Sequence, residues 1–155
     1  MHTNGTRRHF FAIGALGLAA TATNAAASDA PAQSGAEQAN IRLVQDFIAA
    51  LLAPHADVRA LLDQYLAPNA SVRWSDSRPA VYGPMAAADA MIASMPSGAT
   101  FSIDIRQIFA HGPLVATYRA DTMKMPGRPD FSASVAGVHV VKGGKIVEYC
   151  DYIIA

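Results

Sequence analysis

Cysteine is almost absent from this 155-residue sequence, and a single residue, Cys150, excludes an internal disulfide. No cluster of Cys and His residues has the spacing of a zinc site, so we expect no bound metal. Charged residues make up only 15% of the chain, and the formal net charge is zero. Because no block of basic residues occurs beyond the pair Arg7–Arg8, we expect no binding to nucleic acid.

A run long enough to span a membrane is also missing. The apolar run from Phe10 to Ala20 is shorter than the roughly 18 residues that a transmembrane helix needs. The two arginines precede this run, and a small-residue stretch ending in Ala-Ala-Ala follows it, which predicts a signal peptide over residues 1–27. The letters TRRHFF favour a twin-arginine signal over a Sec signal, and hence export to the periplasm.

Residues 28–39 are small and polar, which predicts a flexible tether in front of one domain at 40–155. Asn40 is expected to cap the first helix. Apolar residues then recur at helical spacing in three segments, and a short strand is expected between the second and the third. The predicted helices span residues 41–53, 57–67 and 84–95, and the predicted short strand spans residues 71–76.

After residue 99 the apolar pattern changes from a helical period to a period of two. Four consecutive strands are predicted, with short turns that contain Gly, Pro or Lys. Short connections make such strands antiparallel neighbours. The expected fold class is α+β, with helices packed on a curved, mainly antiparallel sheet that encloses a pocket. The predicted strands span residues 100–112, 113–125, 131–143 and 145–154.

Three charged residues fall on strand faces that otherwise look apolar. Arg119 and Asp121 are two residues apart, so they share one strand face with Val115 and Met123. Asp151 lies on the last predicted strand. Because a lone buried charge is costly, we expect the three to pair, with the guanidinium bridging both carboxylates.

The segments VYG at 81–83, VATYRAD at 115–121 and VAGVHVVKGGKIVEYCDY at 135–152 resemble a known family. Together with the order of helices before strands, they look like the nuclear transport factor 2-like, or SnoaL-like, superfamily. Within it, the chain is most similar to the limonene-1,2-epoxide hydrolases. The resemblance covers about residues 41 to 153 and implies a cone-shaped fold around a pocket.

The resemblance implies an epoxide hydrolase that needs neither a metal nor an organic cofactor, and the predicted signal peptide implies that it is exported. An Asp-Arg-Asp triad in that family opens an epoxide in one step. Carried over, Asp151 deprotonates the attacking water, Asp121 protonates the epoxide oxygen, and Arg119 bridges them. Two carboxylates can take opposite roles when one is ionised and the other protonated. The expected ligand is a small lipophilic molecule, and relatives of this fold suggest a homodimer through the outer sheet face.

The expected pocket lining is largely apolar, as a lipophilic ligand requires. Trp74 is expected to form core or pocket wall. His139 alternates with Val135 on its strand, which favours a half-buried, hydrogen-bonded histidine facing the pocket rather than a catalytic one. The remaining predicted lining residues are Met91, Met95, Met123, Val135, Tyr149 and the strand residues discussed next.

The sequence departs from the family where a Tyr and an Asn, two residues apart, hold the water. Counting back from residues 81–83 places Arg73 and Ser75 there, whereas counting forward from residues 65–67 places Val72 and Trp74 there. A one-residue slip exchanges the faces of a strand. An inward Arg73 would lower the pKa values of the carboxylates and oppose a protonated Asp121.

Two other functions therefore stay open at this point. A SnoaL-like isomerase or cyclase would use one carboxylate, with a raised pKa, to move a proton next to a carbonyl. A non-catalytic protein that binds a small molecule, or a dimerisation module, would use Arg73 to neutralise the acids.

Overall fold

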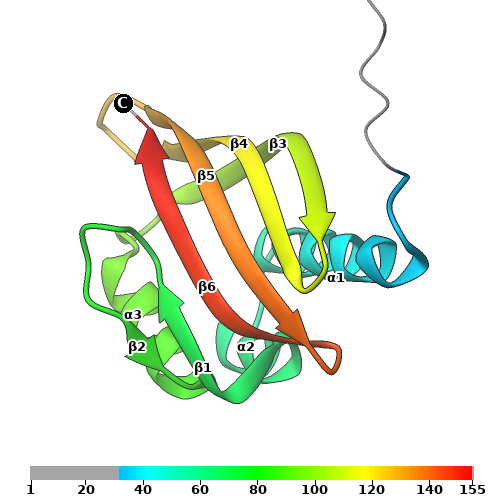
Figure 1. Cartoon of the computed structure of the whole chain (residues 1–155). Coiled ribbons are helices and arrows are strands. Elements are labelled where there is room, and N and C mark those ends of the chain that lie inside the picture. Colours follow the sequence, from blue (N-terminus) through cyan, green and yellow to red (C-terminus); the bar gives the residue numbers. More distant parts are fainter. Residues whose placement is uncertain (1–31, 155) are drawn as a thin grey trace, which may run out of the picture. The chain divides into compact units, whose positions relative to one another are not determined.

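The computed structural model describes residues 32–154, and within that range the chain forms three helices and six strands. The predicted signal peptide and the first part of the predicted tether lie outside the described residues. The α+β fold is confirmed, with helices packed on a mixed, curved sheet (Figure 1). No helix in the described range is long and apolar enough to cross a membrane.

Helix α1 (Gly35–Leu51) begins six residues earlier than the sequence pattern predicted. Ser34 caps it and Glu37 completes a capping box, so residues 35–39 belong to the helix and not to the predicted tether. Glu37 also accepts from the backbone N–H of Gly112 at 2.8 Å. Asn40 is not a cap; its amide donates to the carbonyl of Gly112 at 3.1 Å. The predicted cap was wrong because the Ser-x-x-Glu signal lay inside the polar segment.

Two shorter helices follow. Helix α2 (Val58–Tyr65) is capped by Asp57, whose carboxylate accepts from two backbone N–H groups. Helix α3 (Pro84–Ser94) starts with a proline at its first turn, after Gly83 in a positive-φ conformation. The predicted existence of both helices is confirmed, although α2 ends before Pro68 because the chain turns directly into a strand.

The four predicted strands after residue 99 are confirmed as an antiparallel meander. They are β3 (Thr100–His111), β4 (Leu114–Lys124), β5 (Phe131–Lys142) and β6 (Lys145–Ile154). Strand β1 (Leu66–Arg73) runs parallel to β6, and the two-residue β2 (Val81–Tyr82) pairs antiparallel with β1. The strand predicted at residues 71–76 is thus observed as β1, which starts and ends earlier than predicted. The sheet order is β2-β1-β6-β5-β4-β3.

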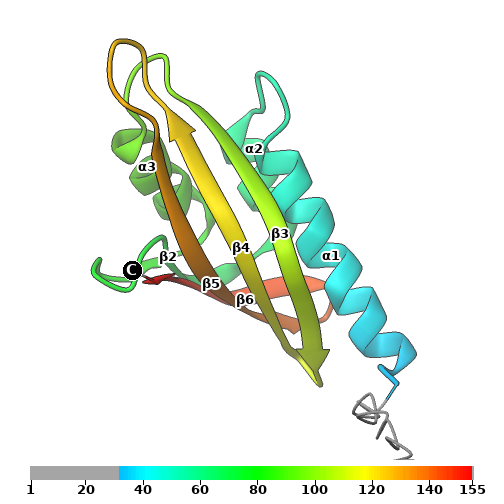
Figure 2. The ribbon, with the colours of Figure 1, turned by 90° about the horizontal axis from the view of Figure 1, so that it is seen from above.

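The helices bridge the two edges of this sheet. Helix α1 contacts β3 and β4, α3 contacts β1 and β2, and α2 contacts both other helices (Figure 2). The long strands bend along their length, as Figures 1 and 2 show. One sheet face and the inner helix faces thereby enclose a common interior. Fully or almost fully buried apolar residues in it include Val44, Phe47, Leu62, Leu66, Val72, Val115 and Ile146.

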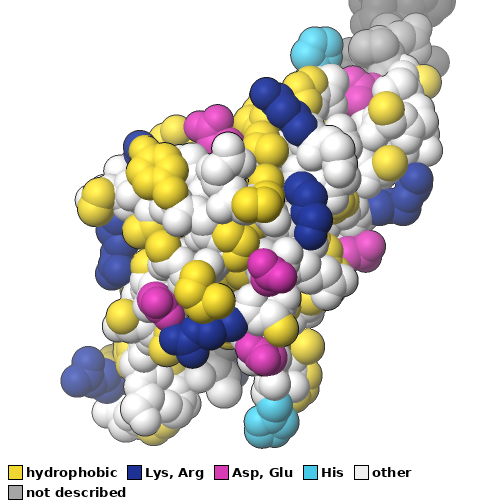
Figure 3. All heavy atoms as spheres, turned by 90° about the horizontal axis from the view of Figure 1, so that it is seen from below, with side chains coloured by type: hydrophobic (Ala, Val, Ile, Leu, Met, Phe, Trp, Pro, Cys, Tyr) yellow, Lys and Arg dark blue, Asp and Glu magenta, His cyan; other side chains and the backbone are white. Residues whose placement is uncertain are grey.

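The surface carries no dominant charge on the face that Figure 3 shows. Hydrophobic side chains there are interspersed with Lys, Arg, Asp and Glu side chains of both signs. This mixture agrees with the zero formal net charge of the chain and gives a polyanion no basic stripe on that face.

Candidate active site

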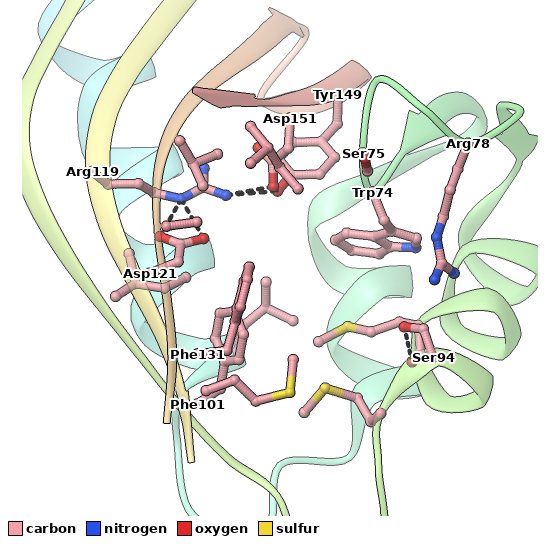
Figure 4. A pocket seen from close by; sticks show the side chains of 18 of the residues that line it. Trp74, Ser75, Arg78, Ser94, Phe101, Arg119, Asp121, Phe131, Tyr149 and Asp151 are labelled. Carbon is pink, nitrogen blue, oxygen red and sulfur yellow. Dashed lines mark hydrogen bonds and ion pairs between the residues drawn. The ribbon is translucent and has the colours of Figure 1, made fainter. Parts of the chain in front are cut away.

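A cavity of about 400 Å³ lies between the curved sheet and the helices (Figure 4). This volume falls within the range of small-molecule sites. The apolar part of its lining comes from α1, α3 and strands β3 to β6. Its members include Leu51, Leu52, Met91, Met95, Phe101, Ile103, Met123, Phe131 and Val135. The polar part includes Ser75, Ser77, Arg78, Ser94, Arg119, Asp121, Tyr149 and Asp151.

Strand β4 directs two charged side chains into the cavity. Its alternating burial turns Arg119 and Asp121 inward, where their side chains are 2% and 10% exposed. The Nε–H of Arg119 lies 2.9 Å from Oδ1 and 3.1 Å from Oδ2 of Asp121. A hydrogen bond from a charged donor is stronger than a neutral one, so this pair holds both side chains in place.

Strand β6 supplies the second carboxylate. The Nη2 group of Arg119 donates to Oδ2 of Asp151, which is also 10% exposed. The hydroxyl of Tyr149, two residues earlier on the same strand, donates to the same oxygen at 2.5 Å. The other oxygen, Oδ1, is buried and has no hydrogen-bond partner within residues 32–154. The structure therefore brings Arg119, Asp121 and Asp151 together, with one carboxylate oxygen left unpaired.

Gly137 on β5 makes this arrangement sterically feasible. It pairs with Thr117 on β4 and with Asp151 on β6, directly below the charged groups. A Cβ atom at this position would lie 2.6 Å from Oγ1 of Thr117 and 3.1 Å from Oδ1 of Asp151, and it would also collide with Arg119. Sequence inspection missed this role, although a glycine inside an apolar strand is a signal for close approach.

Burial sets the protonation of these groups. It raises the pKa of Asp151, while Arg119 and the Tyr149 hydroxyl partly oppose that rise. Burial also raises the pKa of Tyr149 well above its ordinary value, so the phenol stays protonated and serves as a donor. Burial would lower the pKa of Arg119, but Tyr149, Asp151 and Asp121 together raise it, so the guanidinium stays charged.

The segment after β1 settles which side chains face the cavity. Trp74 and Ser75 both line it, because the strand ends at Arg73 and the chain then bends. The Trp74 ring donates from Nε1 to the carbonyl of Ala87 at 3.0 Å. Arg73 is exposed and does not line the cavity, so its predicted place in the pocket was wrong. Val72 belongs to the buried core.

His139 lies in the core and not in the pocket lining. It is fully buried, and its ring packs against those of Phe47 and Tyr149. Neither ring nitrogen has a hydrogen-bond partner among the described residues. Burial, together with the charge of Arg119, lowers the pKa of His139 to about 3. The predicted half-buried histidine facing the pocket was wrong because the rings of Phe47 and Tyr149 cover it within the core.

Met91, Met95, Met123 and Val135 line the cavity, where the sequence placed them. Sequence reasoning missed Arg78, which also lines it. Arg78 lies in the loop between β1 and β2, where side-chain directions follow no periodicity that a sequence reveals. Within residues 32–154, no group of three or more His, Cys, Asp or Glu side chains is placed to hold a metal ion.

A family model, described as the limonene-1,2-epoxide hydrolase (LEH) catalytic domain, matches residues 38–155. Among curated protein sequences, none matches the chain significantly. A solved LEH-like epoxide hydrolase from M. tuberculosis is 24% identical, with a TM-score of 0.63. That match covers 76% of this chain and 84% of the other.

Other solved structures share the fold. A protein described as a SnoaL-like polyketide cyclase from Jannaschia sp. CCS1 is 16% identical, with a TM-score of 0.68, over 79% of this chain and 90% of that one. A hypothetical protein with a ketosteroid isomerase-like fold from Catenulispora acidiphila, in complex with trimethylamine, is 17% identical. Its TM-score is 0.58, over 71% of this chain and 83% of that one. At these identities the likeness concerns the fold alone.

Proposed function

The chain belongs to the limonene-1,2-epoxide hydrolase family, and we propose that it hydrolyses a lipophilic epoxide to a diol in one step. The observation that carries this proposal is the convergence of Asp121, Arg119 and Asp151 in one largely apolar cavity. The apolar lining suits a lipophilic substrate, and the two carboxyl groups supply a base and an acid.

Asp151 acts as the base. Its Oδ2 accepts from Arg119 and Tyr149, so the buried, unpaired Oδ1 is the oxygen that takes a proton from water. As the proton moves to Asp151, the water oxygen bonds to one epoxide carbon. The raised pKa of Asp151 makes its ionised form a stronger base than an ordinary aspartate.

Asp121 acts as the acid. It donates its proton to the epoxide oxygen as the carbon–oxygen bond breaks, and the product is a vicinal diol. One guanidinium compensates one ionised carboxylate, so a buried triad with Asp121 protonated is neutral overall. After turnover the proton has moved from Asp121 to Asp151, and it must return before the next cycle.

Tyr149 supports the base in a different way from the Tyr and Asn that hold the water in the family. No Tyr or Asn occupies either predicted pair of positions: Val72 on β1 is core, and Trp74 just after β1 is pocket wall. Ser75 is 8% exposed, but its hydroxyl already bonds to Asp76 and Ser77. The Tyr149 hydroxyl instead donates to Oδ2 of Asp151 and leaves Oδ1 unpaired.

The alternatives fit the geometry less well. An isomerase of the SnoaL type needs a lone carboxyl group, whereas Asp151 is joined to Asp121 through Arg119. A non-catalytic binding protein or dimerisation module was expected to use Arg73 to neutralise the acids, but Arg73 is exposed and does not line the cavity.

The test compares the purified protein with its Asp151→Asn variant on a panel of terpene and cycloalkene epoxides. Asp104→Asn is the control, because Asp104 is exposed and pairs with Arg106 outside the cavity. We expect diol, detected by mass spectrometry, from wild type and Asp104→Asn, and a loss of at least about 1000-fold in Asp151→Asn. If no epoxide gives diol while Asp151→Asn is as stable as wild type, the pocket has another function.

A further inference from the structure

The cavity has two polar ends with an apolar region between them. Figure 4 shows Arg119, Asp121 and Asp151 at one end and Arg78 at the other, with Trp74 between them. Met91 and Met95 add further apolar surface from α3. A ligand that fills this cavity is therefore met by polar groups at both ends and by apolar groups along its middle.

Arg78 is the cationic group that this cavity offers to a ligand. Arg119 also lines the cavity, but its guanidinium is engaged by Asp121, Asp151, Thr117 and Tyr149. No described carboxylate forms an ion pair with Arg78. A guanidinium without a partner at the rim of an apolar cavity is suited to bind an anion through two parallel hydrogen bonds.

The turn that carries Arg78 is held by a buried serine. The backbone N–H of Arg78 donates to the carbonyl of Ser75 at 3.0 Å. The Ser75 hydroxyl lies 2.8 Å from that of Ser77 and accepts from the Ser77 N–H at 3.3 Å. Because Ser75 is only 8% exposed, this network anchors the turn against the cavity wall and places Arg78 at its rim.

We infer that Arg78 binds a carboxylate at the far end of the substrate, so that the substrate is an amphipathic epoxide acid. The alkyl part lies along Trp74 and the methionines, and the epoxide reaches the triad. The reverse orientation is disfavoured, because an anion at the inner end would meet the carboxylates of Asp121 and Asp151. Charge thereby sets the direction in which the substrate enters.

This substrate class rests on the proposed hydrolase function of the same pocket, but its test measures binding without turnover. Trp74 is the only tryptophan of the chain and lines the cavity, so its fluorescence reports ligand binding. The probes are decanoate and 1-decanol, which have the same chain length and differ in charge at pH 7. The proteins are wild type, Arg78→Gln and the control Arg73→Gln, which removes an exposed arginine outside the cavity.

We expect wild type and Arg73→Gln to bind decanoate about tenfold more tightly than 1-decanol. Arg78→Gln is expected to lose this preference while it binds 1-decanol as wild type does. Equal binding of the two probes by wild type, a preference that survives in Arg78→Gln, or no binding of either probe would overturn the carboxylate site. Diol formation without a preference for decanoate would support the hydrolase function and overturn the carboxylate site. A preference for decanoate without diol formation would support the carboxylate site and overturn the hydrolase function.

Discussion

At the scale of single residues, the site depends on how the two oxygens of Asp151 are used. Arg119 and Tyr149 both donate to Oδ2, and both donors stabilise the ionised carboxylate. Burial acts in the opposite direction and raises the pKa of this group. The balance between these effects determines the pH above which the base is available.

We predict that Tyr149→Phe moves the acid limb of the pH profile to higher pH. The change removes a donor to ionised Asp151, so the pKa of Asp151 rises further and a higher pH is needed to ionise the base. The measurement is kcat/KM for an epoxide substrate across pH 4 to 8. Tyr118→Phe is the control, because Tyr118 is exposed on the outer sheet face. An acid limb that does not move would show that Tyr149 does not tune the base.

At the scale of elements, strand register brings the triad together. Period two in β4 places Arg119 and Asp121 on one face, which the sequence alone predicted. In β6 a register shift opposite Val140 and Val141 of β5 lets Ile146 and Tyr149, three residues apart, both become buried. A strict alternation would have placed Val147 on the inner face instead. Such bulges are hard to find in a sequence because they depend on the neighbouring strand.

The prediction at this scale concerns β5. Gly137→Ala introduces a Cβ atom that collides with Arg119 and lies 2.6 Å from the Thr117 hydroxyl, so the guanidinium must move away from Asp151. We expect activity to fall about 100-fold, since small misplacements of reacting groups have effects of that size. The stability should fall by about 1–3 kcal/mol, the usual effect of overpacking.

Kinetics and urea unfolding of Gly137→Ala should be measured beside Ser134→Ala. Ser134 lies on the opposite face of the same strand and is expected to retain both activity and stability. Wild-type activity in Gly137→Ala would mean that the close approach below the triad has no role in placing Arg119.

At the scale of the whole molecule, the buried neutral His139 links folding to pH. Its pKa is about 3 in the folded state, against an ordinary value of 6.5. The unfolded chain therefore binds one more proton than the folded chain between these values. Stability from His139 is fully present above pH 6.5 and is lost as pH falls toward 3.

We predict that His139→Leu reduces the fall in the free energy of unfolding between pH 7 and pH 4 by about 3 kcal/mol. The measurement is urea unfolding of each protein at both pH values. A loss of packing energy in the variant that is the same at both pH values cancels in this difference. His55→Asn, which changes an exposed histidine with positive φ, should leave the difference as in wild type. An unchanged pH dependence in His139→Leu would mean that another group controls acid unfolding.

Export through the signal peptide and formation of a homodimer stay predictions, which cell fractionation and light scattering would test. The exposed Phe109, Tyr118 and Tyr152 are apolar side chains available to such a dimer.

Apolar periodicity in the sequence determined the helices, the four-stranded meander and the inward direction of Arg119, Asp121 and Asp151. These features follow from local repeats of 3.6 and 2 residues, which can be read without knowing the fold. Tertiary structure decided that Trp74 and Ser75 line the cavity, that His139 lies in the core and that Arg78 lines the pocket. Each depends on where a strand ends or on which side chain covers another, and those relations join residues far apart in the chain. The sequence carried the charges, but only the folded sheet decided which of them share the cavity.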